Sequence, residues 1–576
     1  MKRNILTILA LILCVGAGSM RAHNAGVAQT SEVKASVGSM RAHNAGVAQT
    51  SEVKASVGSM LAHNAGVSQA SEVKASVGSV QAYNAGTVQA QETGRAQETG
   101  RAQAPTDVLP MNIGVPAECE DVMLQAFYWD SYKDQTETDS KYGRTRWVNL
   151  LADTTAITSD FDLVWLPPSA FADGGKGKGG VGYTPKQYNN QDSDWGTKGK
   201  LQELIRVLHN HGTKVIGDIV INHRGNFNNW CNFFEDDFTV LYGGKFQLTQ
   251  QHICRGDEGF TSSSSTCYGA ATSERGAADT GSNFNGARDL DHTNEYVQKW
   301  AKAYLKWMQG HMKYDGFRYD MTLGYHGRYL EMYNEACEPY ISVSECWDVI
   351  ARQKQHLEEC NYNTMVFDFP QKDLLKKAII NGSYSALKKN SNSFRGQGLE
   401  RYAVTFVDNH DTFDRNDTYN QFGSSDLTTA TAKARILQAY AYLMSMPGVP
   451  CVFWPHWKSY QSEISELIAI RKRAGIHSES KVLEESSGQY QYSATVQGHR
   501  GQVVVRVGQN RSMDTPEGFT QVANGNHYTV YLKEMSEGTE AVSIPECGTR
   551  KVIYNGQVYI LREGKTYTLT GSEIKE

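Results

Sequence analysis

The chain has 576 residues, of which 40% are hydrophobic, so it is long enough for a large catalytic domain and at least one smaller module. Its formal net charge is -5, which gives no electrostatic argument for binding nucleic acid or an anionic membrane surface. The 30 tyrosines and 10 tryptophans offer stacking platforms for sugar rings, although ordinary core packing accounts for most of them.

The first 18 residues are predicted to form a signal peptide. Lys2 and Arg3 precede an apolar run, and small residues follow that run. We therefore expect a secreted protein, either extracellular or periplasmic. Lipid anchoring at Cys14 is the less favoured alternative, because Leu13 stands where a small residue is normally required. The apolar run is shorter than the roughly 20 residues that span a bilayer, and no later run is long enough, so no transmembrane segment is expected.

Residues 19–106 contain a direct repeat with a period of 20 residues, which begins at Ser19, Ser39, Ser59 and, in a decayed copy, at Ser79. The repeats lack the large apolar residues that a stacked solenoid needs, so we predict a disordered linker. His23, His43 and His63 recur with the repeat. These histidines could bind a metal ion, but repetition of the 20-residue unit is enough to explain their spacing.

From about residue 107, short apolar runs alternate with amphipathic stretches, a pattern typical of a parallel sheet with crossover helices. Three of the predicted helices cover residues 200–211, 295–312 and 430–446. Eight β/α units in one run favour an α/β fold of the closed (β/α)8 TIM barrel type. The predicted strands cover residues 121–129, 163–169, 214–222, 316–321, 340–346, 364–369, 403–409 and 450–454.

The barrel is expected in two parts, residues 107–222 and 293–476. Between them, after the third strand, residues 223–292 are too long for an ordinary barrel loop and are predicted to form a small inserted domain. In residues 477–576, apolar and polar residues alternate between turn signals, which indicates a C-terminal antiparallel β-domain.

The chain has ten cysteines, and removal of Cys14 with the leader would leave an odd nine, so at least one thiol should stay unpaired. Cys254 and Cys267 flank a Ser- and Gly-rich loop and are the favoured disulfide pair. No close Cys/His spacing suggests a structural zinc site.

Three acids stand at the carboxyl ends of predicted strands, where barrel enzymes carry their active sites. Asp320 ends GFRYD, Glu345 ends YISVSE, and Asp411 follows AVTFVDNH. Each acid alone could be a helix cap or a solvated loop residue. Together they suit cleavage of a glycosidic bond, which needs one acid to protonate the leaving oxygen and one carboxylate to attack or stabilise the sugar.

Four segments resemble the ordered sequence regions of the α-amylase family of glycoside hydrolases, and the wording is most similar to plant-type members. They are DIVINH (218–223), GFRYD (316–320), SECWD (344–348) and FVDNHD (406–411). The resemblance extends from about residue 120 to the carboxyl end. It implies a (β/α)8 barrel that hydrolyses internal α-1,4 bonds of starch, glycogen and maltooligosaccharides through a covalent glycosyl-enzyme.

The resemblance also implies roles for individual residues. Asp320 would be the nucleophile, Glu345 the general acid and then base, and Asp411 the residue that stabilises the distorted sugar. Arg318 lies two residues before Asp320, and so on the same face of its strand, where it can keep the nucleophile ionised. The resemblance implies that two histidines and one tyrosine bind the sugar at the point of cleavage, namely His223, His410 and Tyr183.

A calcium ion is the expected cofactor, since Ca²⁺ prefers carboxylate and carbonyl oxygens. Asn222 ends the third strand, and Asp279 and Asp289 lie in the insertion with the separation of the corresponding plant-type acids. Backbone carbonyls matching Ser282 and Gly324 would complete the site. A solvated acidic loop is the alternative.

Some residues depart from the family pattern, notably Leu323 and His326 in MTLGYH and Cys346 beside the acid. The chain is expected to act as a monomer on an α-glucan. Debranching of α-1,6 links and glycosyl transfer remain open, because the same three acids serve all these reactions. A noncatalytic starch-binding surface protein is the alternative from another class.

Overall fold

The computed structural model describes residues 112–133, 142–172, 180–227, 229–241, 243–413, 422 and 426–535, together with the backbone of short strands between residues 20 and 82 and between 550 and 574. No helix within these ranges is both long enough and apolar enough to cross a membrane. The signal peptide predicted for residues 1–18 lies outside the described residues.

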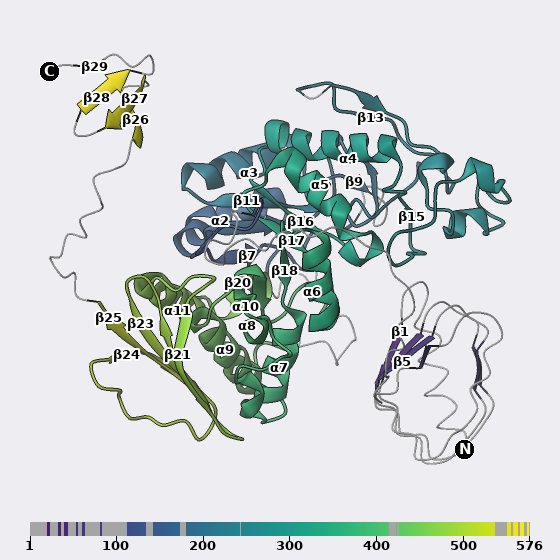
Figure 1. Ribbon diagram of the computed structural model, residues 1–576. Helices are drawn as coiled ribbons and strands as arrows, with labels where there is room; N and C mark the ends of the chain where they lie inside the picture. Colours follow the sequence, from purple (N-terminus) through teal and green to yellow (C-terminus); the bar gives the residue numbers. More distant parts are fainter. Residues whose placement is uncertain are drawn as a thin grey trace, which may run out of the picture.

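A closed ring of eight parallel strands forms the centre of the molecule (Figure 1). Seven of the strands lie within predicted segments, and β20 begins one residue before the segment predicted for it, 450–454. Hydrogen bonding closes the ring in the order β11, β16, β17, β18, β19, β20, β7, β8. The predicted barrel is therefore confirmed. The strands are β7 (Met123–Gln125), β8 (Leu163–Leu166), β11 (Lys214–Ile219), β16 (Gly316–Tyr319), β17 (Ser342–Ser344), β18 (Met365–Phe367), β19 (Ala403–Phe406) and β20 (Val449–Phe453).

Helices surround the barrel, and several begin where the sequence supplies a capping side chain. Thr197, Asn294 and Thr429 each accept a hydrogen bond from a backbone N–H of the first turn of α3, α4 and α9. The predicted helix 295–312 consists of α4 and a following π-helical turn, Met308–Met312. The helices are α2 (Trp147–Asp160), α3 (Lys198–Asn210), α4 (Glu295–Trp307), α5 (Gly327–Cys337), α6 (Ile350–Glu359), α7 (Phe369–Ile379), α8 (Phe394–Gln397), α9 (Ala430–Ser445), α10 (Trp454–Ser459) and α11 (Gln461–Ala474).

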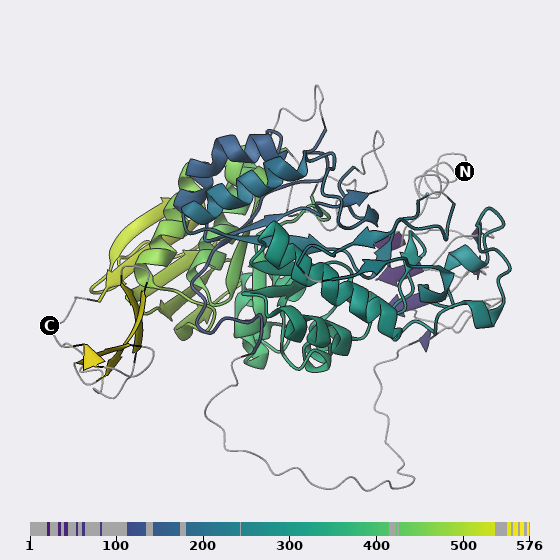
Figure 2. The same ribbon diagram turned by 90° about the horizontal axis from the view of Figure 1, so that it is seen from above.

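The segment between β11 and α4 has little regular structure and projects from one side of the barrel (Figure 2). Its two ends pair with each other, because β12 (His223–Arg224) runs antiparallel to β15 (Arg288–Asp289). A second short pair joins β13 (Asp236–Asp237) to β14 (Lys245–Phe246). Buried ion pairs, Arg224 with Asp236 and Arg288 with Asp257, hold the loops to these ends.

The disulfide of this insertion joins Cys231 to Cys267, so the predicted pairing of Cys254 with Cys267 is wrong. The backbone N–H of Cys231 donates to the hydroxyl of Thr266, which brings the two cysteine segments together. Cys254 is instead a buried free thiol that donates to the carbonyl of Leu290.

The C-terminal part is antiparallel, as predicted. Its first sheet has the order β21, β22, β23, β25, β24 and packs against α9 and α11, on the side of the barrel away from the insertion (Figures 1 and 2). A second sheet contains β26 to β29. The strands are β21 (Lys481–Ser487), β22 (Tyr492–Gln497), β23 (Gly501–Val507), β24 (Thr520–Gly525), β25 (Tyr528–Glu534), β26 (Arg550–Tyr554), β27 (Gln557–Arg562), β28 (Lys565–Thr568) and β29 (Glu573–Ile574).

In the repeat segment only short strands are described. Strands from successive repeats pair in parallel at the repeat period, with β1 (Met20–His23) beside β3 (Met40–His43) and β3 beside β5 (Met60–His63). Strand β6 (Gln81–Ala82) extends this sheet, and β2 (Val33–Ala35) pairs with β4 (Val53–Ala55). The rest of the predicted linker, 19–106, lies outside the described residues.

Candidate active site

Arg318 is the centre of an ion-pair cluster at the carboxyl ends of β11, β16 and β17. Its Nη1 lies 2.8 Å from Asp218 Oδ1 and 2.8 Å from Asp320 Oδ1, and its Nη2 lies 2.9 Å from Glu345 Oε1. The strand register places Arg318 directly beside Asp218. The guanidinium is almost fully buried, so one cation holds three carboxylates with little screening by water.

This cluster favours retention of protons by Asp218 and Asp320. Burial raises the pKa of Asp218 to about 6, against the opposing effect of Arg318 and of the Tyr183 hydroxyl. Burial also raises the pKa of Asp320 well above its usual range, with repulsion from Glu345 and Asp218 adding to the effect and Arg318 opposing it. When several buried carboxyl groups face fewer positive charges than would neutralise them, one of the groups can stay protonated while another is ionised.

Glu345 follows β17 directly and is held from two sides. Its Oε1 faces Arg318, and its Oε2 accepts a hydrogen bond of 2.9 Å from the backbone N–H of Met321. Met321 adopts a left-handed conformation with φ of 46°, which is costly for a residue with a side chain. This strained turn, which begins the atypical MTLGYH segment, thus supplies a donor to the acid.

Asp411 lies in the loop after β19. Its Oδ2 is 3.1 Å from Nε2 of His410, whose Nδ1 contacts the side-chain amide of Gln125. The loop is fixed by the buried ion pair between Asp408 and Lys372. The structure therefore brings all three predicted acids to the same end of the barrel.

Three aromatic rings form a wall beside these acids. The rings of Tyr183, Trp129 and His410 are parallel to within 10°, with centroids 5.2 to 5.9 Å apart. The Tyr183 hydroxyl donates to Asp218 Oδ2 at 2.7 Å. Parallel aromatic faces of this kind suit stacking against a sugar ring.

His223 forms a hydrogen bond to the backbone of one residue of this wall. Its Nε2 donates to the carbonyl of Tyr183 at 2.9 Å, and its Nδ1 faces the side-chain amide of Asn222. Burial lowers the pKa of His223 to about 4, so the ring is neutral at physiological pH. His223, which was predicted to bind the sugar, therefore donates its hydrogen bond to the backbone of Tyr183, which was predicted to stack on the sugar.

The residues predicted to bind calcium also meet, and their oxygens fit a hard cation. The amide nitrogen of Asn222 faces His223 and Asp289, which leaves its Oδ1 for a ligand role. Asp279 Oδ2 is buried and accepts no hydrogen bond from the described residues. Burial raises the pKa of Asp289 to about 8, with the Asp279 carboxylate adding to the effect. A cation would relieve both the unsatisfied oxygen and the repulsion.

The two predicted carbonyl ligands lie at the same place. A Cβ on Gly324 would lie 1.8 Å from Asn222 Oδ1, so only glycine fits there. The backbone N–H of Ser282 donates to the carbonyl of Leu323, which ties the insertion to the loop after β16. His326, also atypical, caps α5 with its side chain, and its backbone N–H donates to the Thr280 hydroxyl.

Sequence reasoning missed several residues that hold the cluster together. The main one is Asp218, which the sequence could have indicated. An acid inside a buried apolar strand requires a buried cation, and Arg318 in the fourth predicted strand was available as that cation. Trp165 donates to Asp218 at 3.1 Å. Trp129 could have been found in the same way as the acids, because it stands at the carboxyl end of the first predicted strand, 121–129.

A polar cavity of about 360 Å³ lies beside the aromatic wall. It is bordered by the residues that follow Tyr183 and Arg224, by Trp230, and by the Arg288–Glu258 ion pair. The complete lining is Thr184, Gly225, Asn226, Asn229, Trp230, Glu258, Gly286, Ala287 and Arg288. Apart from Thr184, every lining residue belongs to the insertion, so the cavity lies mainly within the insertion.

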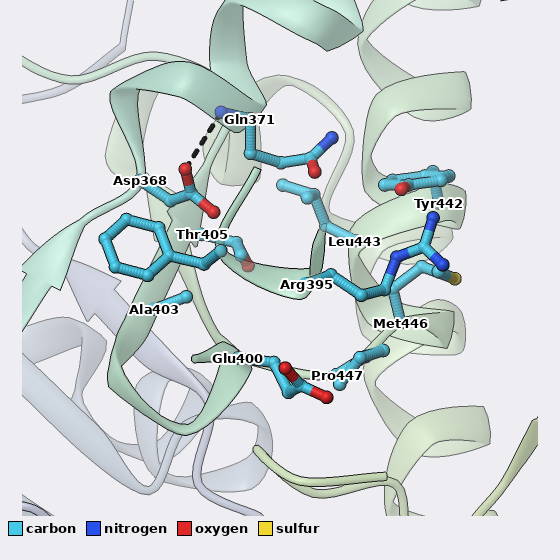
Figure 3. A pocket seen from close by; sticks show the side chains of 11 residues that line it. Asp368, Gln371, Arg395, Glu400, Ala403, Thr405, Tyr442, Leu443, Met446 and Pro447 are labelled. Atoms are coloured by element: carbon cyan, nitrogen blue, oxygen red, sulfur yellow. Dashed lines mark hydrogen bonds between the residues drawn. The ribbon is translucent and has the colours of Figure 1, made fainter. Parts of the chain in front are cut away.

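A different cavity, between β19, α7 and α9, has a volume of only about 20 Å³ and contains none of the predicted site residues (Figure 3). Asp368, Gln371 and Thr405 line it. This space suits one water molecule that would satisfy buried polar atoms, rather than a sugar.

Comparison with known proteins agrees with this geometry. Residues 160–329 match the family model described as "Alpha amylase, catalytic domain". The chain is 29% identical over 448 residues to a probable α-amylase 2 of Arabidopsis thaliana, covering 72% of this chain and 94% of that protein. It is 36% identical over 135 residues to an α-amylase type B isozyme of Hordeum vulgare, covering 23% of this chain and 80% of that sequence. It spans only 40% of the chloroplastic α-amylase 3 of Arabidopsis thaliana, at 29% identity over 400 residues.

Solved structures confirm the fold. An α-amylase from Anoxybacillus superposes with a TM-score of 0.51 at 14% identity, covering 73% of this chain and 99% of that one. A cyclomaltodextrin glucanotransferase superposes with a TM-score of 0.53 at 15% identity, covering 72% of this chain and 100% of that one.

Proposed function

Since the chain belongs to the α-amylase family of glycoside hydrolases, we propose that it hydrolyses internal α-1,4 bonds of starch, glycogen and maltooligosaccharides with retention of configuration. The bonding of Asp320 and Glu345 to the two ends of the Arg318 guanidinium carries this proposal. It is compatible with the separation of roughly 5 to 5.5 Å that retaining enzymes have between their carboxyl groups. A relative from Roseateles saccharophilus, 26% identical over 471 residues, covering 77% of this chain and 73% of that protein, is named glucan 1,4-α-maltotetraohydrolase and supports the linkage.

In the first step, Asp320 attacks the anomeric carbon and forms a covalent bond to the sugar. Its Oδ1 is held by Arg318, while its Oδ2 accepts no hydrogen bond from the described residues and is available as the nucleophilic atom. Glu345 gives its proton to the leaving glycosidic oxygen. In the second step, the ionised Glu345 takes a proton from water, which attacks the same carbon and releases Asp320.

Asp411 and His410 would contact the hydroxyls of the sugar at the cleavage point and stabilise its distorted ring. Tyr183 would stack under that sugar beside Trp129. His223 holds the Tyr183 backbone in place through its 2.9 Å hydrogen bond, and could contact the sugar after giving up that bond.

A bound Ca²⁺ would supply a fixed positive charge between the insertion and the barrel. Asn222, Asp279 and Asp289 would hold it with side-chain oxygens, and Ser282 and Gly324 with backbone carbonyls. We also propose that the chain is exported and acts as a monomer.

Product analysis tests the reaction. Amylose, pullulan and maltotriose are incubated with the native chain, with Glu345→Gln and with Glu335→Gln, a matched change on the exposed surface of α5. Short maltooligosaccharides should appear from amylose with the native chain and the control, while Glu345→Gln loses roughly two to four orders of magnitude in kcat.

Full activity in Glu345→Gln would overturn the proposed acid. Release of maltotriose from pullulan would instead indicate cleavage of α-1,6 links, and longer products from maltotriose would indicate glycosyl transfer. Binding to starch without release of reducing sugar by the native chain would indicate a noncatalytic binding protein.

A further inference from the structure

Two histidines and one glutamate from distant parts of the sequence meet at the end of the barrel opposite the catalytic acids. Glu118 precedes β7, His477 follows α11, and His499 lies in the turn between β22 and β23. One ligand atom of each residue lies within 4.8 Å of the others. The cluster thus joins the start of the barrel, its last helix and the C-terminal sheet.

Backbone hydrogen bonds fix all three positions. The N–H of Ser478 donates to the carbonyl of Cys119 at 2.9 Å, and the N–H of His499 donates to the carbonyl of Gly475 at 3.0 Å. The N–H of Glu118 donates to Glu479 Oε2 at 2.7 Å, and Glu118 has a left-handed φ of 44°. A strained residue held by such contacts is a common feature of functional sites.

The hydrogen bonding of His499 leaves a position for a cation. Its Nδ1 lies 3.0 Å from Glu120 Oε1, and its Nε2 lies 3.4 Å from Glu118 Oε2. If Nδ1–H donates to Glu120, the lone pair of Nε2 faces a carboxylate oxygen, and either a proton or a metal ion must lie between them. A carboxylate that orients a histidine through its other nitrogen is the usual partner of a metal-bound histidine.

The 3.4 Å separation has the right size for a tetrahedral metal. Bonds of about 2.0 to 2.1 Å from Zn²⁺ to nitrogen and oxygen place neighbouring ligand atoms about 3.3 to 3.4 Å apart. The same ligands would suit Ca²⁺ poorly, because Ca²⁺ prefers oxygen atoms only.

His477 completes the cluster. It is buried, and its ring lies parallel to that of His499 to within 17°, with centroids 4.2 Å apart. Its Nδ1 accepts a long hydrogen bond of 3.3 Å from the N–H of Glu479. A neutral His477 ring can bind an ion through either nitrogen. In both cases it loses only the hydrogen bond from the Glu479 N–H.

We propose that Glu118, His477 and His499 bind one divalent transition metal ion of the Zn²⁺ class. The ion fastens the C-terminal sheet to the barrel, far from the glucan site, so it stabilises the fold without taking part in hydrolysis. Glu118 and His499 are partly exposed, with side-chain exposures of 59% and 42%, which gives the ion a path from solvent.

Zinc binding to the full chain tests this proposal. The repeat histidines are first removed as competitors by His23→Tyr, His43→Tyr and His63→Tyr, because Tyr83 already occupies the equivalent position in the fourth repeat. In this background, Zn²⁺ is titrated by calorimetry with Ca²⁺ in excess, and unfolding is followed by heating. His499→Gln and Glu118→Gln test the cluster, and His211→Gln is the matched control at an exposed histidine of α3's end.

The background chain and the His211→Gln control should bind one Zn²⁺ with micromolar or better affinity and show a higher Tm with Zn²⁺. Each cluster variant should lose at least tenfold in affinity and lose the Tm increase, while keeping its activity on amylose. Cobalt in place of zinc should give the visible absorption of a tetrahedral site in the background chain and the His211→Gln control, but not in the cluster variants. Equal zinc binding in all variants, or no binding in the background chain, would overturn the proposal.

Discussion

The hydroxyl of Tyr183 offers a single-atom test of the cluster, because it is one of three donors to the buried carboxylate of Asp218. It donates at 2.7 Å to the oxygen that also accepts from Trp165, while Arg318 bonds to the other oxygen. Tyr183→Phe removes this donor and keeps the ring in the aromatic wall. We therefore expect a loss of stability with little change in KM.

The size of the loss should depend on pH. A hydrogen bond to a charged group contributes about 1.5 to 3 kcal/mol, and one to a neutral group about 0.5 to 1.5 kcal/mol. Burial raises the pKa of Asp218 from its ordinary value of 3.8 to about 6 in the folded chain. Burial therefore destabilises the folded state increasingly as the pH rises from about 4 to about 6. Since the hydroxyl lowers this pKa, its removal extends that increase to higher pH, and the variant should lose about 1.5 to 3 kcal/mol at pH 8 but about 0.5 to 1.5 kcal/mol at pH 5.

Urea unfolding at pH 5 and pH 8 measures both values for the native chain, for Tyr183→Phe and Tyr183→Ala, and for the control Tyr268→Phe. Tyr268 is 59% exposed. Tyr183→Ala also removes the stacking surface, so its KM for maltoheptaose should rise about tenfold, equivalent to about 1.4 kcal/mol. Equal losses at the two pH values, or equal KM values for the Phe and Ala variants, would refute this account of Tyr183.

Three other predictions concern the insertion. With Ca²⁺ as the only divalent ion present and Zn²⁺ removed beforehand, a chelator should lower the Tm of the native chain by several degrees, whereas Asp289→Asn should have a lower Tm with Ca²⁺ and no response to the chelator; an unchanged native melting curve contradicts the calcium site. Trp230→Ala, at the 360 Å³ cavity, should raise KM about tenfold for maltoheptaose and little for maltotriose, and equal changes for both would show that the cavity does not hold the longer glucan. Cys231→Ser should cost about 3 to 4 kcal/mol because the disulfide closes a separation of 36 residues, and a native chain treated with reductant should match it in urea unfolding.

The barrel could be predicted from sequence because its signals are local. The predicted strands are short segments rich in apolar residues, such as LVWL, and the predicted helices between them have apolar faces, so eight alternations favour the closed ring. The predicted strands extend past the observed ends, as at 340–346 against Ser342–Ser344 in β17. Polar residues beyond the ladder, such as Glu345, remain near its end because Glu345 N–H still donates to the carbonyl of Tyr319.

The insertion could not be predicted in the same way, because its structure depends on contacts between distant residues. Cys267 is 13 positions from Cys254 and 36 from Cys231, and the short separation favoured the wrong partner. The hydrogen bond from the Cys231 N–H to the hydroxyl of Thr266, the residue before Cys267, has no sequence signal. The Glu118, His477 and His499 cluster is hidden for the same reason, since its members lie far apart along the chain.

The count of charges around Arg318 links the fold to the proposed chemistry. Asp218, Asp320 and Glu345 share one guanidinium in a nearly dry site, so full ionisation would leave an excess charge of about -2 there. Such an excess is costly at low dielectric constant, and uptake of one proton reduces it. The proposed reaction needs this state, with one carboxylate to attack and one carboxylic acid to protonate the leaving oxygen. Asp218 touches neither reacting atom in this mechanism, yet its negative charge raises the pKa of Asp320, whereas the Arg318 guanidinium lowers that pKa and so favours the ionised nucleophile that the reaction needs.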